Sequence, residues 1–525
     1  MALLRIAAVK KLLNFLVLTA GGLFATVSFS QFKIEETSIA AIRQAMDAGQ
    51  VSSVELVEQS LARIAAYDKK GPSVNAIITL NPRALELARE RDEMLARGDF
   101  MGPLHGIPLV VKDNYDTADM PTSAGSLSLK NSVPPDDAYQ VRKLRAAGAV
   151  IIAKTNMYEF AFSPYETVSS VLPGHTLNPY ALNRTTAGSS GGTAAAVAAS
   201  FAVAGLGTDT GNSIRGPSSH NALVGIRSTI GLTSRDGIVP LYLDHDVGGP
   251  MARNVADAAL ILDVIAGYDP ADPVTIGASK QPAVRFVDYL DADGLRGAKI
   301  GVLRQLSNRQ GADADVLAAF ATALRDLERA GATVIDDVRI DELEQMVPPV
   351  SENRLDVWCS RFKFDLENYL QSLGDNAPVK TLQEIIDSGQ HHPKLAADLA
   401  YFQEQLPPAE NEECIAAVAG RKQLTKSVGQ LLANNSFDAL VFPTWSNPPR
   451  LIGDMNTPHG DNSQHIAPHT GFPGITVPMG YVLDTLPVGL QFVGPAYSEA
   501  TLIRLAFAYE QATHHRRAPA STPPL

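Results

Sequence analysis

Two glycine- and serine-rich loops, separated by a run of small residues, constrain the fold of this chain more than any other feature of its sequence. The first loop, 187–193, reads Ala-Gly-Ser-Ser-Gly-Gly-Thr, and the second, 207–216, reads Gly-Thr-Asp-Thr-Gly-Asn-Ser-Ile-Arg-Gly. A helix over 191–202 runs about 18 Å at about 1.5 Å per residue, and the strand that follows returns about 20 Å. Because the two lengths nearly cancel, we expect Ser189 and Ser213 at the same edge of one sheet.

Apolar runs of strand length alternate with helical patterns along the chain. The run 107–111 ends at Lys112, and the run 149–153 follows a helical pattern that stops at Gly148. Strands that alternate with helices in this way predict an α/β layered core. The other expected elements are a helix capped by Ser52 and Glu55, helices at 83–96 and 499–512, and strands at 474–478 and 488–493.

Three segments are predicted to lie outside this alternating core. Residues 155–190 are mostly loop, and the polar run 183–186 excludes a regular strand just before Gly188. The segment at about 338–435 is charged, helix-like and low in glycine, which indicates a helical insertion. The proline-rich end of the chain is predicted to be disordered.

The first 30 residues have the layout of a secretory signal. Arg5, Lys10 and Lys11 precede an apolar stretch over 12–29, and cleavage is expected after Ser30. An uncleaved anchor helix is the alternative, although the stretch is barely long enough to span a bilayer. We therefore expect an exported protein, periplasmic or secreted, with one domain over 31–525 and no stable membrane association after cleavage.

The net charge bears on which partners the chain can bind, and the cysteine content on whether it can form a disulfide. The net charge of the 525 residues is −12, and no cluster of cations is present to replace counterions on phosphates. A nucleic-acid partner is therefore not expected, and a small molecule is. The sequence leaves open whether the two cysteines, Cys359 and Cys414, are joined.

The two serine-rich loops have the residues that hydrolysis of an amide requires. Such a reaction needs a nucleophile with a group that takes its proton, and donors aimed at the developing oxyanion. Backbone N–H groups from Thr210, Gly211, Asn212 and Ser213 are candidate donors. Lys112 is the best candidate base, provided that its pKa falls from about 10.4 toward 7–8, a change of about 4 kcal/mol.

The loops together resemble the signature of the amidase signature family. The resemblance covers nearly all of residues 35–516 except the helical insertion, with the motifs in the family's order. It implies a three-layer αβα sandwich with a central mixed β-sheet flanked by helices, and an amidase that needs no metal or organic cofactor. The matching strings are 112–114, 154–157, 188–192, 207–215, 225–229, 231–237 and 486–494.

The resemblance also implies a role for each matching residue. Ser213 is the implied nucleophile, Ser189 the serine that relays its proton, and Lys112 the base. The Gly188–Ser189 peptide bond is expected to be cis. The resemblance assigns Asp209 and Arg215 to bracing the nucleophile loop, includes Ser190 in the matched string, and implies a substrate pocket at Met157 and Phe160.

One position departs from the pattern of the family. Asn212 stands next to the implied nucleophile, where many members have a second glycine. Because an oxyanion hole uses backbone N–H groups, a side chain is tolerated there if it points away. The substrate is not specified: aryl amides, peptide C-terminal amides and fatty amides all remain open.

Three rival functions are weighed against an amidase. An α/β-hydrolase esterase would use Ser190 in a G-x-S-x-G elbow, which requires a strand directly before it. A glutaminase component of a tRNA-dependent amidotransferase shares the signature, but an export signal argues against it. An inactive binding protein would not be expected to retain all three catalytic residues. His465 and His469 are four residues apart but lack the pattern of a zinc site.

Overall fold

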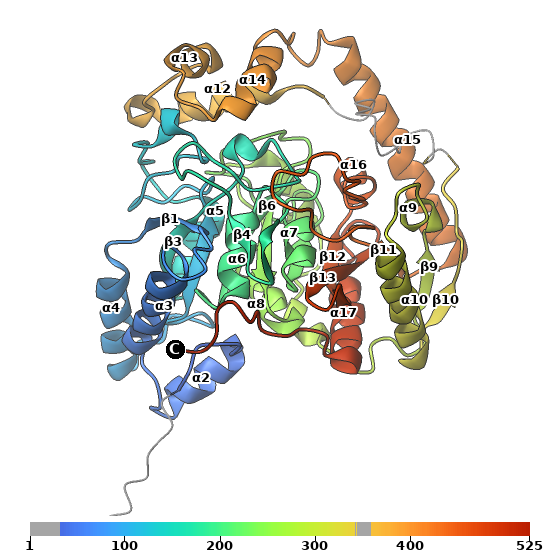
Figure 1. Cartoon of the computed structure of the whole chain (residues 1–525), viewed down its shortest axis with the longest axis horizontal. Helices are drawn as coiled ribbons and strands as arrows, with labels where there is room; N and C mark the ends of the chain where they lie inside the picture. Colours follow the sequence, from blue (N-terminus) through green and yellow to red (C-terminus); the bar gives the residue numbers. More distant parts are fainter. Residues whose placement is uncertain (1–31, 342, 344–358) are drawn as a thin grey trace, which may run out of the picture. The chain divides into compact units, whose positions relative to one another are not determined.

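A mixed sheet of eleven strands runs through the computed structural model, which describes residues 32–341, 343 and 359–525 (Figure 1). Its order is β1-β3-β2-β6-β8-β7-β12-β13-β11-β9-β10, and β4 and β5 form a separate pair. The strands are β1 (Ile77–Leu80), β2 (Pro108–Lys112), β3 (Val150–Thr155), β4 (Leu177–Asn178), β5 (Ala181–Thr185), β6 (Ala204–Asp209), β7 (Val224–Arg227), β8 (Val247–Ala252), β9 (Lys299–Val302), β10 (Thr333–Ile335), β11 (Ala439–Pro443), β12 (Gly474–Val482) and β13 (Leu486–Val493).

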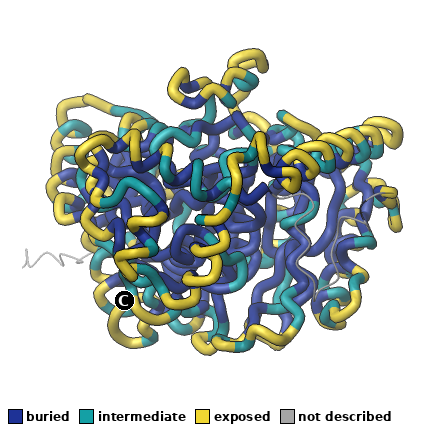
Figure 2. Tube along the Cα trace, turned by 90° about the horizontal axis from the view of Figure 1, so that it is seen from above, coloured by how far each residue is buried: buried dark blue, intermediate teal, exposed yellow. Residues whose placement is uncertain are grey.

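Helices flank this sheet, as predicted. Figure 2 shows buried segments in the interior of the molecule and exposed segments at its periphery. The α-helices are α2 (Ile39–Asp47), α3 (Ser53–Tyr67), α4 (Ala84–Ala96), α5 (Tyr139–Ala146), α6 (Gly191–Ala198), α7 (Arg215–His220), α8 (Val255–Ile265), α9 (Arg304–Ser307), α10 (Ala314–Arg329), α12 (Phe362–Ser372), α13 (Leu382–Ser388), α14 (Ala396–Gln403), α15 (Glu412–Asn435), α16 (Ala467–Thr470) and α17 (Glu499–Thr513). Short 3₁₀ helices are η1 (Leu127–Leu129), η2 (Glu159–Ala161), η3 (Pro273–Lys280), η4 (Phe286–Tyr289), η5 (Gly374–Asn376) and η6 (Pro393–Leu395).

Local sequence signals fix several of these elements. The Ser52 side chain accepts a hydrogen bond from the Glu55 backbone, and the Glu55 carboxylate accepts one from the Ser52 backbone, so the predicted capping box is confirmed. Every residue of α6 is buried, because its glycine and alanine residues are small enough to let the helix lie close to strands β2, β6 and β8. It ends at Ala198, earlier than predicted, where the positive φ of Ser200 starts a loop.

The prediction that no strand precedes Gly188 is wrong. Strand β5 ends at Thr185 and pairs antiparallel with β4, and the Thr185 backbone also donates to the Arg450 carbonyl. The Asn178 side chain donates to the carbonyls of Thr185 and His220, which holds the polar turn in place. This hairpin lies outside the main sheet, so it is not the central strand that an α/β-hydrolase elbow requires.

Helices α12 to α15 occupy most of the described part of the segment 338–435. An apolar cluster joins α12, α13 and α14 to residues of the loop 157–168. Cys359 and Cys414 form a disulfide, which answers the question that the sequence left open. No helix among residues 32–341, 343 and 359–525 is long and apolar enough to cross a membrane.

Residues from Ile34 to the C-terminus form one compact unit. The predicted signal, 1–30, lies outside the described residues. The prediction of a disordered C-terminal end is wrong. The buried Arg63 guanidinium donates to the Thr522 and Pro523 carbonyls, so the tail supplies acceptors for this group in addition to Ala199 and Glu35.

Deleting residues 521–525 should lower the free energy of unfolding by about 1–3 kcal/mol, because the Arg63 guanidinium would lose two of its acceptors. Equilibrium urea denaturation measures the change. In an Arg63→Met background the same deletion should cost less, since the donors are already absent. An unchanged unfolding midpoint after deletion in the natural chain would contradict the role of the tail.

Candidate active site

Lys112 and Ser189 meet where β2, β6 and the start of α6 come together. Lys112 is the last residue of β2, which pairs in parallel with β6. Its amine donates to the Ser189 hydroxyl at 2.8 Å and to the Thr208 hydroxyl at 2.7 Å. Ser189, just before α6, therefore lies near Thr208 at the end of β6, the strand that leads into the turn with Ser213.

The Lys112 amine lies in an environment that favours its neutral form. The residue is completely buried, and burial lowers its pKa from 10.5 to about 7, while the negative charges of Asp246 and Asp209 oppose this shift. In the part of the chain that the structure describes, no carboxylate lies within ion-pair distance of the amine. An amine with this pKa accepts a proton near neutral pH.

The turn after β6 carries Ser213. It is held by the Asp209 carboxylate, which accepts hydrogen bonds from the Ile214 backbone at 3.2 Å and the Arg215 guanidinium at 3.0 Å. Arg227 also pairs with Asp209, at 3.1 Å, and all three charged groups are completely buried. Burial alone would raise the pKa of Asp209, but the two guanidinium charges bring it down to about 2.

Backbone N–H groups of this turn are unpaired. No acceptor within the described residues engages the N–H of Gly211, Asn212 or Ser213, although all three residues are buried. Buried N–H groups without a partner are rare, so three in succession indicate a place for an anionic oxygen. The Arg215 guanidinium fixes the turn by donating to the Gly211 carbonyl at 2.7 Å.

Side chains on both sides of the turn are held by carboxylates. The Thr210 hydroxyl donates to Asp246, and the Asn212 amide donates to Asp461. The Asn212 side chain is therefore held by Asp461, at the position where the amidase signature often has a second glycine.

Ser190 couples the two serine-rich loops. Its hydroxyl donates to the Thr208 carbonyl at 3.1 Å and accepts from the Thr208 backbone at 3.3 Å. The Asn114 amide donates to the Thr208 hydroxyl at 3.1 Å. These bonds hold the start of α6 against the end of β6, and the Gly188–Ser189 peptide bond between them is cis.

The loop with Met157 and Phe160 lies directly beside Ser189. The Tyr158 backbone donates to the Ser189 carbonyl at 3.1 Å. Met157 and Phe160 are themselves buried in the apolar cluster with α12, whose Phe362 ring is 5.6 Å from that of Phe160. The two side chains therefore join the serine loop to the helices above it.

Sequence reasoning missed three residues of this site: Thr208, Arg227 and Asp246. Thr208 accepts from Lys112, and Asp246 accepts from Thr210. Arg227 had a visible signal, because a cation at the end of a short apolar strand needs a buried partner. Asp246 gave none, since only the fold brings it to the turn. Nowhere in the described ranges do three or more His, Cys, Asp or Glu residues group so as to hold a metal ion.

Comparison with known proteins defines the class. The amidase family model matches residues 55–503. A probable amidase of Arabidopsis thaliana is 34% identical over 519 residues, which cover 96% of this chain and 95% of that relative. The A component of the glutamyl-tRNA(Gln) amidotransferase of Anaeromyxobacter dehalogenans is 36% identical over 481 residues, 88% of this chain and 93% of that relative.

Solved structures indicate the same family of enzymes as the sequence comparisons. The native peptide amidase of Stenotrophomonas maltophilia superimposes with a TM-score of 0.83 and 39% identity, covering 93% of this chain and 99% of that one. The A component of the glutamyl-tRNA(Gln) amidotransferase of Thermotoga maritima gives a TM-score of 0.71 and 27% identity, with 93% and 98% covered. The chain belongs to the amidase family, the amidase signature enzymes. It is an amide-hydrolysing enzyme.

Proposed function

We propose that the protein is an exported amidase that cleaves carboxamide C–N bonds through an acyl-enzyme on Ser213. The observation that carries the proposal is the contact of the buried Lys112 amine, 2.8 Å from the Ser189 hydroxyl, with no carboxylate paired to it among the described residues. A neutral amine in this position accepts a proton from a serine, and a charged one does not.

The first half of the reaction forms the acyl-enzyme. Ser213 Oγ attacks the carbonyl carbon, and its proton passes through the Ser189 hydroxyl to Lys112. The oxyanion of the tetrahedral intermediate accepts hydrogen bonds from backbone N–H groups of the turn at Gly211 and Asn212. When the C–N bond breaks, the proton returns from Lys112 through Ser189 to the leaving nitrogen, so ammonia or an amine departs neutral.

The second half releases the acid. Water attacks the ester carbonyl of the acyl-enzyme, and its proton takes the same route to Lys112. Collapse of the second intermediate breaks the bond to Ser213 Oγ, which regains a proton through Ser189. The products are a carboxylic acid, which ionises, and free enzyme, with no metal or organic cofactor consumed.

The substrate class that we propose is the C-terminal carboxamide of a peptide. Support comes from the 39% identity to a peptide amidase over nearly the whole of both chains. We further propose that the loop with Met157 and Phe160, whose Tyr158 backbone donates to the Ser189 carbonyl, borders the site of the scissile amide. Aryl and fatty amides are the comparison substrates.

The similarity to amidotransferase A components favours one second candidate, a glutaminase that passes ammonia to a partner. The two functions differ in what the purified chain does alone. An amidase releases ammonia from peptide amides without a partner, whereas a glutaminase of an amidotransferase uses glutamine and depends on its complex.

Replacing Ser213 with alanine should abolish release of ammonia from a peptide amide, and Lys112→Ala should lower kcat by several orders of magnitude. Ammonia release from peptide, aryl, fatty and glutamine amides measures both the rate and the substrate class. Ser219→Ala is the matched control, because Ser219 is a buried serine of the neighbouring helix α7, and it should retain activity. A near-normal rate in either catalytic variant would end this mechanism.

Export is the second part of the proposal. The residues 1–30 have the layout of a signal, and a disulfide between Cys359 and Cys414 suits an oxidising compartment. Expressed at full length in a bacterium with a periplasm, the mature protein should begin at Gln31 and appear in the periplasm or medium. N-terminal sequencing checks this; a cytoplasmic chain that retains Met1 would contradict it.

A further inference from the structure

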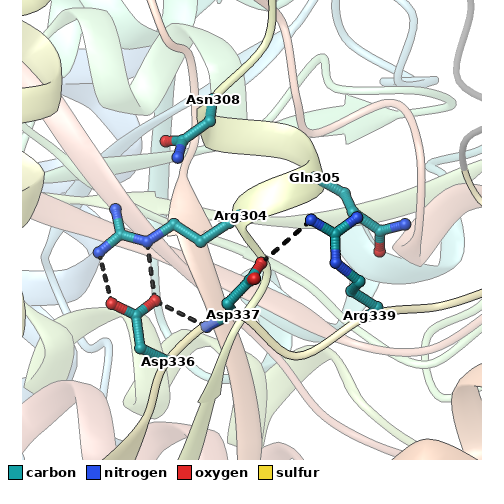
Figure 3. A pocket seen from close by; sticks show the side chains of 6 residues that line it. All are labelled: Arg304, Gln305, Asn308, Asp336, Asp337 and Arg339. Carbon is teal, nitrogen blue, oxygen red and sulfur yellow. Dashed lines mark hydrogen bonds and ion pairs between the residues drawn. The ribbon is translucent and has the colours of Figure 1, made fainter.

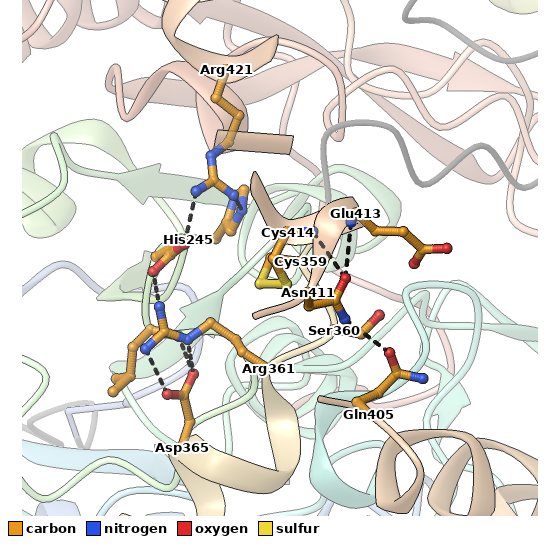
Figure 4. Close-up of a disulfide and its surroundings, with 12 residues drawn as sticks. His245, Cys359, Ser360, Arg361, Asp365, Gln405, Asn411, Glu413, Cys414 and Arg421 are labelled. Carbon is orange, nitrogen blue, oxygen red and sulfur yellow. Dashed lines mark hydrogen bonds and ion pairs between the residues drawn. A yellow bond between two sulfur atoms is a disulfide. The ribbon is translucent and has the colours of Figure 1, made fainter. Parts of the chain in front are cut away.

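The disulfide closes a helical segment over residues 359–414, which we call the disulfide-closed segment. Cys359 and Cys414 are both buried, and α12, α13 and α14 lie between them. Helix α15 begins at Glu412, so the same bond joins the start of α12 to the start of α15, as Figure 4 shows. The placement of α12 relative to α15 therefore depends on this bond.

Two polar contacts connect this segment to loops of the active site. Lys394 pairs with the buried Glu166, and the Gly188 backbone donates to the carbonyl of Pro164 in the same loop at 2.7 Å. The Tyr369 hydroxyl donates to Asp116 at 2.7 Å, four residues after Lys112. The segment thus lies against the chain segments that carry both Lys112 and Ser189.

A third contact gathers two arginines on one carboxylate. Arg361, two residues after Cys359, donates to Asp244. Arg421, on the first half of α15, donates to the other oxygen of Asp244 at 2.7 Å and to His245 Nε2 at 2.7 Å. The disulfide fixes the distance between the two helix starts that supply these arginines.

The contact with Arg421 defines the state of His245. A guanidinium can only donate, so Nε2 of the ring accepts and carries no proton. Its Nδ1–H then donates to the Pro468 carbonyl at 3.0 Å. Burial also lowers the pKa of His245 well below its ordinary value, so the ring is neutral and Asp244 is the anionic partner of both arginines.

The opposite side of the same loop faces the oxyanion turn. The Thr210 hydroxyl donates to Asp246 at 2.5 Å, and Arg227 donates to the His245 carbonyl at 2.6 Å. Arg227 is also a partner of the buried Asp209 that holds the nucleophile turn. Residues 244–246 therefore touch the arginines on one side and the catalytic turn on the other.

We propose that Asp244 is a positioning residue for the amidase reaction, and that the Cys359–Cys414 disulfide acts through it. This role rests on the proposed function. Asp244 holds residues 244–246 in place, and the contacts of Asp246 with Thr210 and of Arg227 with Asp209 then place the oxyanion turn. The intact disulfide keeps Arg361 and Arg421 on Asp244. A displaced turn binds substrate but stabilises the transition state less, because its N–H donors no longer meet the oxyanion.

A more exposed ion pair elsewhere in the chain provides a control for Asp244. Arg304 donates to both oxygens of Asp336 at 2.7 and 2.9 Å, in the pocket that Figure 3 shows. The Asp336 side chain is 56% exposed, against 24% for Asp244. The pair joins α9 to the chain after β10 and does not involve the serine loops, so it supplies a matched control of the same chemistry.

Asp244→Asn in the full chain should lower kcat for a peptide amide by about 10- to 100-fold, while KM stays within about twofold. Asp336→Asn should leave both constants unchanged. Circular dichroism and thermal unfolding establish that each variant folds. A kcat for folded Asp244→Asn that equals that of Asp336→Asn would overturn the role of Asp244.

The dependence on the disulfide is tested by a double-mutant cycle. Cys359→Ser with Cys414→Ser should also lower kcat, and combining it with Asp244→Asn should add little further loss, because both changes release the same loop. Losses that multiply would overturn the proposal that the disulfide acts through Asp244. If Asp244→Asn fails to fold, Arg421→Lys and Arg421→Gln replace it: lysine should retain most of kcat and glutamine should lose it, whereas equal rates would overturn the proposal.

This test is separable from that of the proposed function. Ser213→Ala measured alongside tests the nucleophile itself. If Ser213→Ala keeps turnover, the proposed mechanism fails; if Ser213→Ala loses turnover and Asp244→Asn keeps it, only the positioning inference fails.

Discussion

The rest of the structure depends on keeping the Lys112 side chain in the interior, where no carboxylate among the described residues pairs with it. Burial lowers the pKa of Lys112 from 10.5 to about 7, which corresponds to a change on the order of 5 kcal/mol between its two protonation states. The two hydroxyls of Ser189 and Thr208 accept its hydrogen bonds without supplying negative charge. Parallel pairing of β2 with β3 and β6 excludes water from the strand that carries it.

The charges near the nucleophile turn are arranged in the opposite way, as a fully paired set. Asp209 is buried with Arg215 and Arg227, and their hydrogen bonds compensate for its removal from water. Buried ion pairs are poor evidence for a gain in stability, because apolar residues of similar size often stabilise a fold equally well. Its value here is geometric: it fixes the backbone of the turn so that the N–H groups of Gly211, Asn212 and Ser213 have no acceptor in the part of the chain that the structure describes.

Patterns that act locally, or along one strand and one helix, predicted five of the eleven strands of the main sheet. The capping box of Ser52 and the strand that ends at Lys112 are examples. The resemblance to the family pointed to Lys112 and Ser189, which the structure brings into contact. Interactions between distant segments were not predictable. Asn178 holds the hairpin β4–β5 by reaching His220, and Arg63 orders the tail by reaching Thr522. Asp246 likewise acquires its partner Thr210 only when the fold brings the two together, and Asp244 acquires Arg421 only when α15 lies beside it.

The dependence of kcat/KM on pH tests the central claim most directly. Measured on a peptide amide between about pH 5 and 11, kcat/KM should fall about tenfold per pH unit below about 7, because the protonated amine cannot accept a proton, and should level off above it. Lys112 is the group whose pKa of about 7 sets this limb. A profile that is flat across neutral pH, or one that rises only above pH 9 as for a solvated lysine, would contradict a buried neutral amine as the base.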